Sequence, residues 1–262
     1  MKAEMDEAML RVAASGAYIM GSHVAELEQQ LAAYVGMKHC ISCANGTDAL
    51  RLSLMAMGIG QGDAVFVPDF TFFATAEAVA MVGATPIFVD VDRETYNINP
   101  SLIYEHYETV KRNTSLRPAA VIAIDLFGLP ADHDALREVC RTCNLLLLED
   151  GAQGFGGSIR GKRACSFGDI ATTSFFPAKP LGCYGDGGAI FTDDDVIADL
   201  CRSICVHGKG PGGKYDNIRV GMNSRLDTLQ AAILLPKFRA LADYEVDARQ
   251  TVAGRYNAAF SG

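Results

Sequence analysis

Residues 174–190 read SFFPAKPLGCYGDGGAI, and this stretch decides the fold prediction. An apolar run ends near Ser174, Lys179 follows it, and a glycine-rich turn leads into a second apolar run at Gly187–Phe191. A lysine between a strand and a tight turn is held at the mouth of a sheet. This is where a lysine that forms a Schiff base would lie.

Outward from this stretch, short apolar runs alternate with amphipathic segments of helical period. Such runs, each separated by a helix, are typical of a mostly parallel sheet covered on both faces. The run at Gly187–Phe191 follows the preceding one too closely for a helical crossover, so we expect it to be antiparallel. The predicted strands are Cys40–Ala44, Ala64–Val67, Pro86–Val89, Ala119–Ile124, Leu145–Leu148, Ile170–Phe175 and Gly187–Phe191. The predicted helices are Lys2–Ala14, Ser22–Val35, Thr47–Met57, Thr71–Val82, Ser101–Arg112, Asp132–Thr142, Asp194–Val206 and Asp227–Ala258. The fold class is therefore α/β, with three layers and a sheet of about seven strands, one of them antiparallel.

Length and composition indicate a globular protein with one large domain. The chain has 262 residues, of which 49% are hydrophobic and 21% charged, so it can bury a sizeable core. Its apolar runs fall far short of the ~20 residues that cross a bilayer, and its N-terminus lacks a signal-peptide pattern. We therefore expect a cytoplasmic protein without a membrane partner.

The charge distribution limits the choice of partners. A formal net charge of -8 argues against nucleic-acid binding, which needs clustered basic residues. Locally the balance reverses, because residues 202–225 contain five basic residues and one acid. This stretch suits a small anionic ligand, or it is a solvated loop. Its basic residues are Arg202, Lys209, Lys214, Arg219 and Arg225.

Eight cysteines include two CxxC pairs, which raises zinc or redox chemistry. Cys140 and Cys143 follow helical spacing and belong to one apolar stripe. Cys40 and Cys43 are an odd number of positions apart in a strand, so they point to opposite faces. We predict buried, reduced thiols in both pairs and no metal, while the roles of Cys165, Cys183 and His207 stay open.

Polar residues follow the predicted strands, where open α/β sheets bind ligands. Gly46 and Thr47 open a helix directly after a strand, which predicts a phosphate site or an ordinary helix cap. Asp150 ends a very apolar run and needs a cation or hydrogen-bond donors as partners. A protonated pyridine nitrogen would serve, and so would a cap or a salt bridge. Together with Lys179 and Ser174, these residues suggest a pyridoxal phosphate site.

Six motifs in order along the chain resemble the DegT/StrS-type nucleotide-sugar aminotransferases, which have the large domain of aminotransferase fold type I. The motifs are ANGTDAL (44–50), PDFTFFAT (68–75), GATPIFVDVD (83–92), LEDGAQGFGG (148–157), SFFPAKPLGCYGDGGAI (174–190) and GMNSRLDTLQAAIL (221–234). The resemblance covers nearly the whole chain.

The resemblance implies a role for each matching residue. Lys179 would hold pyridoxal 5'-phosphate as a Schiff base, and Asp150 would pair with the ring nitrogen; both would be catalytic. Gln153 would contact the ring near its phenolic oxygen, and Phe72 would stack on it. The phosphate would be held by Gly46, Thr47 and Ser174, and by Asn223 of a neighbouring subunit, with Arg225 a weaker candidate for that interface. Shared sites of this kind imply a homodimer.

The resemblance also implies the reaction and the domains. The enzyme would transfer an amino group, usually from glutamate, to a nucleotide-linked keto sugar, with C3 favoured over C4, for polysaccharide or glycoside biosynthesis. Relatives that are sugar dehydratases replace the lysine with histidine, and a non-catalytic regulatory or interaction protein on the same fold is a further alternative. We expect an N-terminal helical segment (1–36), a cofactor-binding α/β domain (37–225), and the helical start of a C-terminal domain (226–262) that is largely absent, as in a fragment.

Overall fold

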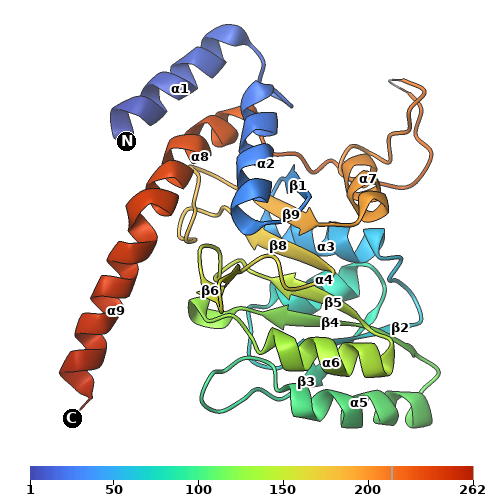
Figure 1. The fold of residues 1–262 in the computed structure, drawn as a ribbon. Coiled ribbons are helices and arrows are strands. Elements are labelled where there is room, and N and C mark those ends of the chain that lie inside the picture. The colour runs from blue at the N-terminus through green and yellow to red at the C-terminus, as the bar shows by residue number, and fades with distance from the viewer. Residues whose placement is uncertain (214, 262) are drawn as a thin grey trace.

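The structure is a computed structural model that describes residues 1–213 and 215–261. Two residues lie outside the described ones: Lys214, in the predicted basic stretch, and Gly262, in the predicted C-terminal segment. A seven-stranded sheet runs through the molecule in the order β1-β9-β8-β5-β4-β2-β3 (Figure 1). Its strands are β1 (His39–Cys43), β2 (Asp63–Pro68), β3 (Thr85–Val89), β4 (Arg117–Ile124), β5 (Leu146–Asp150), β8 (Ile170–Ser174) and β9 (Gly188–Thr192).

The predicted fold class is confirmed. The pairs β2–β3, β2–β4, β4–β5 and β5–β8 are parallel, whereas β9 is antiparallel to both β8 and β1. The strand predicted at Gly187–Phe191 is therefore the one that runs against the others. Consequently β1, β2, β3, β4, β5 and β8 all end at the same edge of the sheet.

Helices cover both faces of the sheet and make the three layers (Figure 1). One face packs against α3 (Gly46–Ala56), α4 (Ala74–Met81) and α7 (Asp195–Ile204) in a single apolar cluster. The other face has two clusters. There α5 (Pro100–Asn113) and α6 (His133–Cys143) cover β2, β4 and β5, and α2 (Ser22–Val35) and α8 (Thr228–Ala240) cover β1, β8 and β9.

The sequence fixes where several helices begin and end. Oδ1 of Asn45 accepts a hydrogen bond of 2.7 Å from the backbone N–H of Asp48 and caps α3. Asp132 caps α6 in the same way through Ala135. Gly16 and Gly36 end α1 (Lys2–Ser15) and α2 in the left-handed conformation, which glycine adopts without steric cost.

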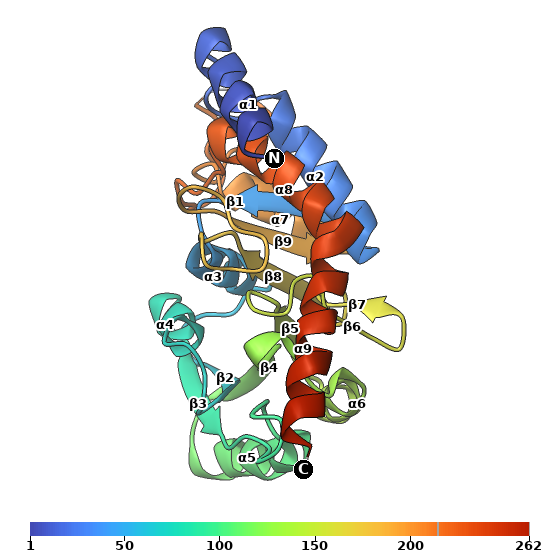
Figure 2. The same cartoon turned by 90° about the vertical axis from the view of Figure 1, so that its left-hand side faces the viewer.

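The predicted C-terminal helix forms, and it is continuous apart from one π-helical turn. After α8 the chain passes through a π-helical turn (Leu241–Glu245) into α9 (Val246–Phe260). Figure 2 shows α9 running along the side of the α/β layers, and none of its residues is buried. At the other end, α1 packs on α8 through Ala8, Val12 and Ala232. The domain boundaries near 36 and 225 stay predictions.

The predicted burial of both CxxC pairs is confirmed, since all eight cysteines are free and buried. Cys40 packs with α2 and α8, whereas Cys43 packs with α3 and α7 on the opposite face. Cys165 and Cys183, whose surroundings the sequence left open, are also buried. Within residues 1–213 and 215–261, helices long and apolar enough to cross a membrane are absent.

Candidate active site

The candidate site lies at the edge where the six parallel strands end. β5 extends two residues further than predicted, because Glu149 and Asp150 pair with Ala123 and Ile124 of β4. Side chains alternate between the faces of a strand, and Leu148 packs with α3 whereas Leu147 packs with α6. Asp150 therefore faces the α3 side of the sheet, and Glu149 faces the α6 side.

The start of α3 meets the end of β8 at the place where the sequence predicts a phosphate site. Gly46 is the first residue of the helix, and a Cβ atom built on it would lie 2.7 Å from Cβ of Ser174. Only glycine permits this approach. It brings the Ser174 hydroxyl against the helix N-terminus, whose first-turn N–H groups favour an anion. Thr47, the second residue of α3, is half-buried and adds another hydroxyl at this end.

Asp150 is a buried carboxyl group, with 9% of its surface exposed. Its Oδ1 accepts a hydrogen bond of 3.0 Å from the backbone N–H of Ala152. Burial raises the pKa of Asp150, and the Ala152 bond and the charge of Lys179 act in the opposite direction. A cation placed against this carboxyl group would therefore be bound strongly, as a protonated ring nitrogen requires.

Lys179 lies in the connection between β8 and β9, and local packing fixes its backbone. Its N–H donates to the carbonyl oxygen of Phe176 over 2.8 Å. The connection folds back so tightly that a Cβ atom on Gly182 would lie 2.5 Å from the carbonyl oxygen of Pro177. The Lys179 side chain is half-buried and interacts electrostatically with Asp150. The structure therefore brings together the lysine and the carboxylate that the sequence singled out.

The other predicted contacts come from separate loops. Gln153 is half-buried in the turn after β5, and its Oε1 accepts a hydrogen bond of 2.8 Å from the N–H of Phe127. Phe72 precedes α4, which begins at Ala74 rather than at Thr71, and its ring is 69% exposed. That exposure leaves a face of the ring open to a ligand.

Asn223 and Arg225 lie together beside the end of β1. Nη2 of Arg225 donates to Oδ1 of Asn223 over 2.6 Å, and the N–H of Ala44 donates to Oγ of Ser224 over 3.1 Å. Asn223 is exposed, as a residue reaching another subunit must be in a single chain. Its predicted role toward a neighbouring subunit stays a prediction.

Part of the basic stretch lines a common groove on the α7 side, whose wall includes Arg202, Lys209 and Arg219. His207 lies within this stretch, shortly after α7. Its backbone is left-handed, with φ 58°, and its N–H donates to the carbonyl oxygen of Met222 over 2.8 Å. The groove is therefore lined by three basic side chains, which favours an anionic ligand.

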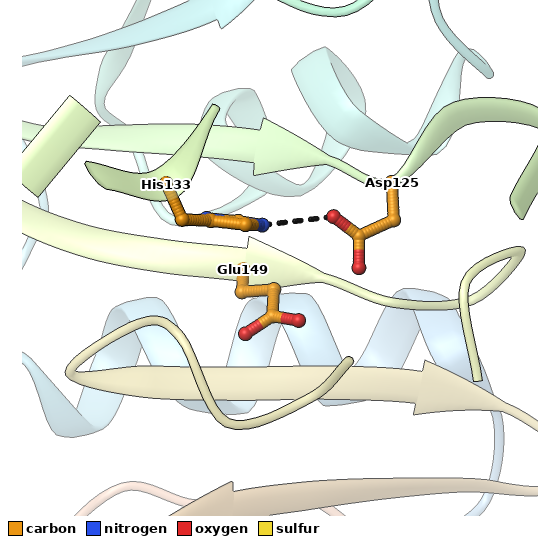
Figure 3. A group of neighbouring side chains, drawn as sticks. All are labelled: Asp125, His133 and Glu149. Carbon is orange, nitrogen blue, oxygen red and sulfur yellow. Dashed lines mark hydrogen bonds and ion pairs between the residues drawn. The ribbon is translucent and has the colours of Figure 1, made fainter. Parts of the chain in front are cut away.

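The opposite face of the same edge holds a buried group that the sequence did not predict. Asp125, His133 and Glu149 offer ligand atoms that all lie within 4.8 Å of one another (Figure 3). Nε2 of His133 lies 2.9 Å from Oδ1 of Asp125, and its ring stacks on Phe167. Asp125 directly follows β4, and Glu149 lies near the end of β5. The histidine gave no signal, because HxxxH or HExxH spacing is absent from the sequence.

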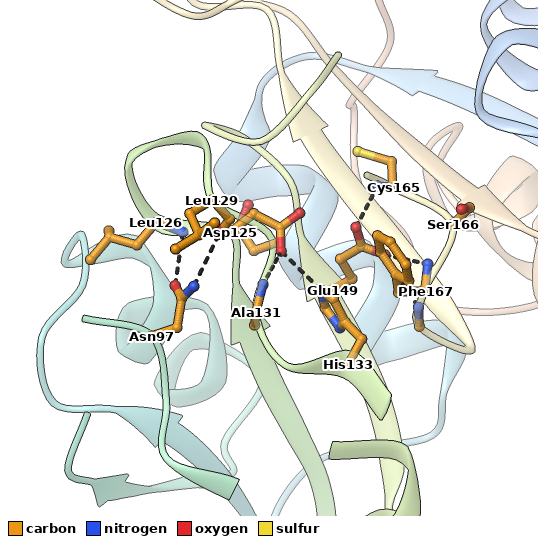
Figure 4. A network of polar contacts seen from close by, with 12 residues as sticks. Asn97, Asp125, Leu126, Leu129, Ala131, His133, Glu149, Cys165, Ser166 and Phe167 are labelled. Atoms are coloured by element: carbon orange, nitrogen blue, oxygen red, sulfur yellow. Dashed lines mark hydrogen bonds and ion pairs between the residues drawn. The ribbon is translucent and has the colours of Figure 1, made fainter. Parts of the chain in front are cut away.

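Both carboxylate oxygens of Glu149 in this buried group are committed to backbone contacts, whereas Oδ2 of Asp125 and Nδ1 of His133 lack a hydrogen-bond partner among the described residues. Glu149 accepts hydrogen bonds from the N–H groups of Cys165, Phe167 and Gly168 (Figure 4). Burial raises the pKa of Glu149 to about 8 and that of Asp125 to about 7. Burial lowers the pKa of His133. We read the group as a structural network.

The residues on the α3 face fit pyridoxal phosphate. The group needs a phosphate cradle, a buried carboxylate for its ring nitrogen, and a lysine that can reach its aldehyde carbon. Gly46, Thr47 and Ser174 supply the first, Asp150 the second and Lys179 the third, all at one sheet edge.

Known proteins align with nearly the whole chain. A 50% identical relative, UDP-2-acetamido-2-deoxy-3-oxo-D-glucuronate aminotransferase of Pseudomonas aeruginosa, aligns with 98% of the chain and 69% of its own length. A "pleiotropic regulatory protein" of Geobacillus stearothermophilus is 42% identical, over 97% of the chain and 66% of that protein. The chain thus spans about two thirds of the length of these relatives.

Solved structures show the same fold. A DegT DnrJ EryC1 StrS aminotransferase from Brucella abortus has a TM-score of 0.96 and 50% identity, over 99% of this chain and 69% of that one. DesV of S. venezuelae, solved with a ketimine intermediate, has a TM-score of 0.92 and 37% identity, over 100% of this chain and 68% of that one.

The family is also evident from its sequence profile. The model of the DegT/DnrJ/EryC1/StrS aminotransferase family matches residues 1–262. The predicted resemblance is thereby confirmed, and with it the predicted class of enzyme and its cofactor, pyridoxal phosphate, at the level of the family. The chain belongs to the DegT/DnrJ/EryC1/StrS aminotransferase family.

Proposed function

We propose that this protein transfers an amino group from glutamate to the C3 keto group of a nucleotide-linked sugar, with pyridoxal phosphate as cofactor. The observation that carries the proposal is the meeting of a buried carboxylate, a half-buried lysine and a glycine-permitted helix N-terminus at one sheet edge. The preference for C3 is supported by the P. aeruginosa relative, whose name specifies a 3-oxo sugar.

Each residue has a physical task in this reaction. The bound cofactor supplies an electron sink, which makes the hydrogen on the carbon beside the amine acidic. Asp150 keeps a positive charge at the ring nitrogen, and Lys179 takes that hydrogen as a proton and returns it at the position required for transfer. Gly46, Thr47 and Ser174 bind the phosphate and so fix the ring against both.

We further propose a homodimer with shared sites. Asn223 is exposed and held by Arg225, which suits a contact with the cofactor phosphate of the other subunit. The groove with Arg202, Lys209 and Arg219 suits the diphosphate of the sugar nucleotide. The shared site can be tested by mixing Asn223→Ala and Lys179→Ala subunits. An equal mixture should recover up to about a quarter of the wild-type activity, because about half of the dimers are mixed and each mixed dimer has one intact site of two.

The test of the reaction uses the purified natural protein loaded with pyridoxal phosphate. Borohydride should fix the cofactor to the peptide containing Lys179, and glutamate with a 3-keto sugar nucleotide should yield 2-oxoglutarate and an amino sugar detectable by mass. Lys179→Arg, which keeps the charge, should abolish both. A protein that shows no visible cofactor absorption, or labelling on another lysine, would overturn the proposal.

A second candidate is a non-catalytic regulatory protein on the same fold, which the G. stearothermophilus relative favours by its name. It predicts that the loaded protein binds the cofactor at Lys179 but releases no 2-oxoglutarate with any keto-sugar nucleotide. A sugar dehydratase is less well supported, because position 179 is lysine. Deoxygenation without 2-oxoglutarate would favour it.

A further inference from the structure

The orientation of the Gln153 amide is fixed by a neighbouring loop. The N–H of Phe127 donates 2.8 Å to Oε1 of Gln153. An N–H group can only donate, so the amide oxygen must face Phe127 and the NH₂ group must face another way. If Gln153 approaches the cofactor ring, it therefore presents its donor end, which suits a phenolic oxygen.

The loop that makes this bond is held in an unfavourable backbone conformation. Phe127 has φ 56° and ψ 14°, in the left-handed region that a bulky side chain rarely adopts. Gly128, the next residue, has φ 91°. Such a conformation is unfavourable for a non-glycine residue and persists only where surrounding contacts impose it.

Asn97 supplies contacts on both sides of that conformation. Its Oδ1 accepts a hydrogen bond of 3.0 Å from the N–H of Leu126, and its Nδ2 donates 3.0 Å to the carbonyl oxygen of Leu129 (Figure 4). The residue is only 4% exposed, so both bonds lie away from water. The Asn97 amide thus holds the backbone on both sides of Phe127 and Gly128 in place.

Asp125 and Ala131 close the same loop from its other side. Oδ1 of Asp125 accepts a hydrogen bond of 3.1 Å from the N–H of Ala131 and lies 2.9 Å from Nε2 of His133, and the N–H of Asp125 donates 3.0 Å to the carbonyl oxygen of Asp150. Asp125 therefore affects Asp150 directly as well as the loop. The Asn97 side chain bonds only the backbone of this loop, whereas Asp125 also bonds Asp150. A substitution of Asn97 therefore tests the loop without changing a contact of Asp150.

We propose that Asn97 is a positioning residue for the cofactor: it holds the loop from Leu126 to Leu129 so that Phe127 keeps the Gln153 NH₂ group directed at the phenolic oxygen of the ring. This inference rests on the proposed function. It adds a residue that contacts neither the cofactor nor any other predicted site residue.

A hydrogen-bond donor at the phenolic oxygen stabilises its negative charge, so losing the donor makes the bound cofactor hold its proton to higher pH. The visible absorption of the loaded protein reports this titration without any turnover. Gln153→Leu should raise the midpoint by about 0.5–1 pH unit, the equivalent of one hydrogen bond. Asn97→Leu should move it in the same direction by at least half as much.

A double-mutant cycle separates positioning from a general effect on the fold. If Asn97 acts through Gln153, the variant carrying both substitutions has the midpoint of Gln153→Leu alone. Asn99→Ala is the matched control, because Oδ1 of Asn99 accepts from the N–H and hydroxyl groups of Ser101 at the start of α5. It should lower the melting temperature without moving the midpoint.

The inference is overturned if Asn97→Leu leaves the midpoint unchanged, if Gln153→Leu does, or if the two shifts add. Should Asn97→Leu fail to fold, Asn97→Asp retains the acceptor for Leu126 and loses the donor to Leu129, and a smaller shift in the same direction is expected. If the midpoint of that variant is unchanged, the inference is contradicted. A wild-type protein without cofactor absorption would instead overturn the proposed function itself.

Discussion

Gly46 and Ser174 approach so closely that a Cβ atom on the glycine would lie 2.7 Å from Cβ of the serine. The helix N-terminus and the end of β8 are thus in contact where the phosphate is expected. Gly46→Ala should force them apart, lower the free energy of unfolding by about 1–3 kcal/mol, and weaken cofactor binding by about tenfold or more. Chemical denaturation and titration of the unloaded protein with pyridoxal phosphate measure the two effects.

Gly254→Ala is the control for this substitution. Gly254 lies in α9, and a Cβ atom there would meet no atom within 4 Å. Alanine stabilises a helix interior by about 0.5–1 kcal/mol relative to glycine, so stability should stay equal or rise and cofactor affinity should not change. Equal affinities for Gly46→Ala and wild type would contradict a phosphate cradle at this contact.

Asp150→Asn tests the carboxylate while preserving its shape. The amide oxygen can still accept from the N–H of Ala152, but the charge against the ring nitrogen is lost. Because burial raises the pKa of Asp150, removal of the charge should leave the unloaded protein at least as stable at pH 8. We expect kcat to fall about 10²–10⁴-fold in an assay of 2-oxoglutarate release.

Asp195→Asn is the matched acid-to-amide control, since Asp195 is exposed and pairs with Lys38 and His39 far from the site. It should retain wild-type kcat. If Asp150→Asn also retained wild-type turnover, Asp150 would not be the partner of the ring nitrogen.

The buried group of Asp125, Glu149 and His133 predicts how stability depends on pH. Burial raises the pKa of Asp125 to about 7 and of Glu149 to about 8, so the folded state keeps protons that the unfolded chain has lost. Stability therefore falls as pH rises through these values. His133 acts oppositely, because its lowered pKa makes stability rise with pH up to its ordinary value of about 6.5. Above that pH, within this group, only the two carboxyl groups contribute.

We therefore expect the free energy of unfolding to fall by about 1–3 kcal/mol between pH 6.5 and 8.5. Asp125→Asn keeps an acceptor for Ala131 and His133 but removes one titrating group and the like charge beside Glu149. It should reduce this fall to less than half, as measured by denaturation at each pH. A pH profile identical to that of the wild type would show that Asp125 is ionised throughout.

Physical reasons decide which features of this protein could be predicted from its sequence. Apolar runs and helical periods were sufficient for the sheet, because parallel strands buried on both faces need continuous apolar sequence. Asp150 and Lys179 were identifiable because strand ends converge at one edge. Asn97 and Phe127 were not, because their contacts depend on left-handed loop backbone at non-glycine residues, which no sequence pattern signals. The strands β6 (Ser158–Ile159) and β7 (Lys162–Arg163) were too short to show a period.

The buried cysteines should neither bind zinc nor react readily with thiol reagents. Both CxxC pairs are buried, and Cys40 and Cys43 face different apolar clusters, so these two thiols cannot converge on one zinc ion. Cys140 and Cys143 lie together in an apolar cluster, where we expect them to stay free thiols. Burial raises the pKa of Cys140 to about 12 and keeps the thiol protonated. A chelator should leave the melting temperature unchanged, and a thiol reagent should react with the native protein at least about 100-fold more slowly than with the unfolded chain. Stoichiometric zinc in the purified protein, or rapid modification of either pair, would contradict the burial of these thiols.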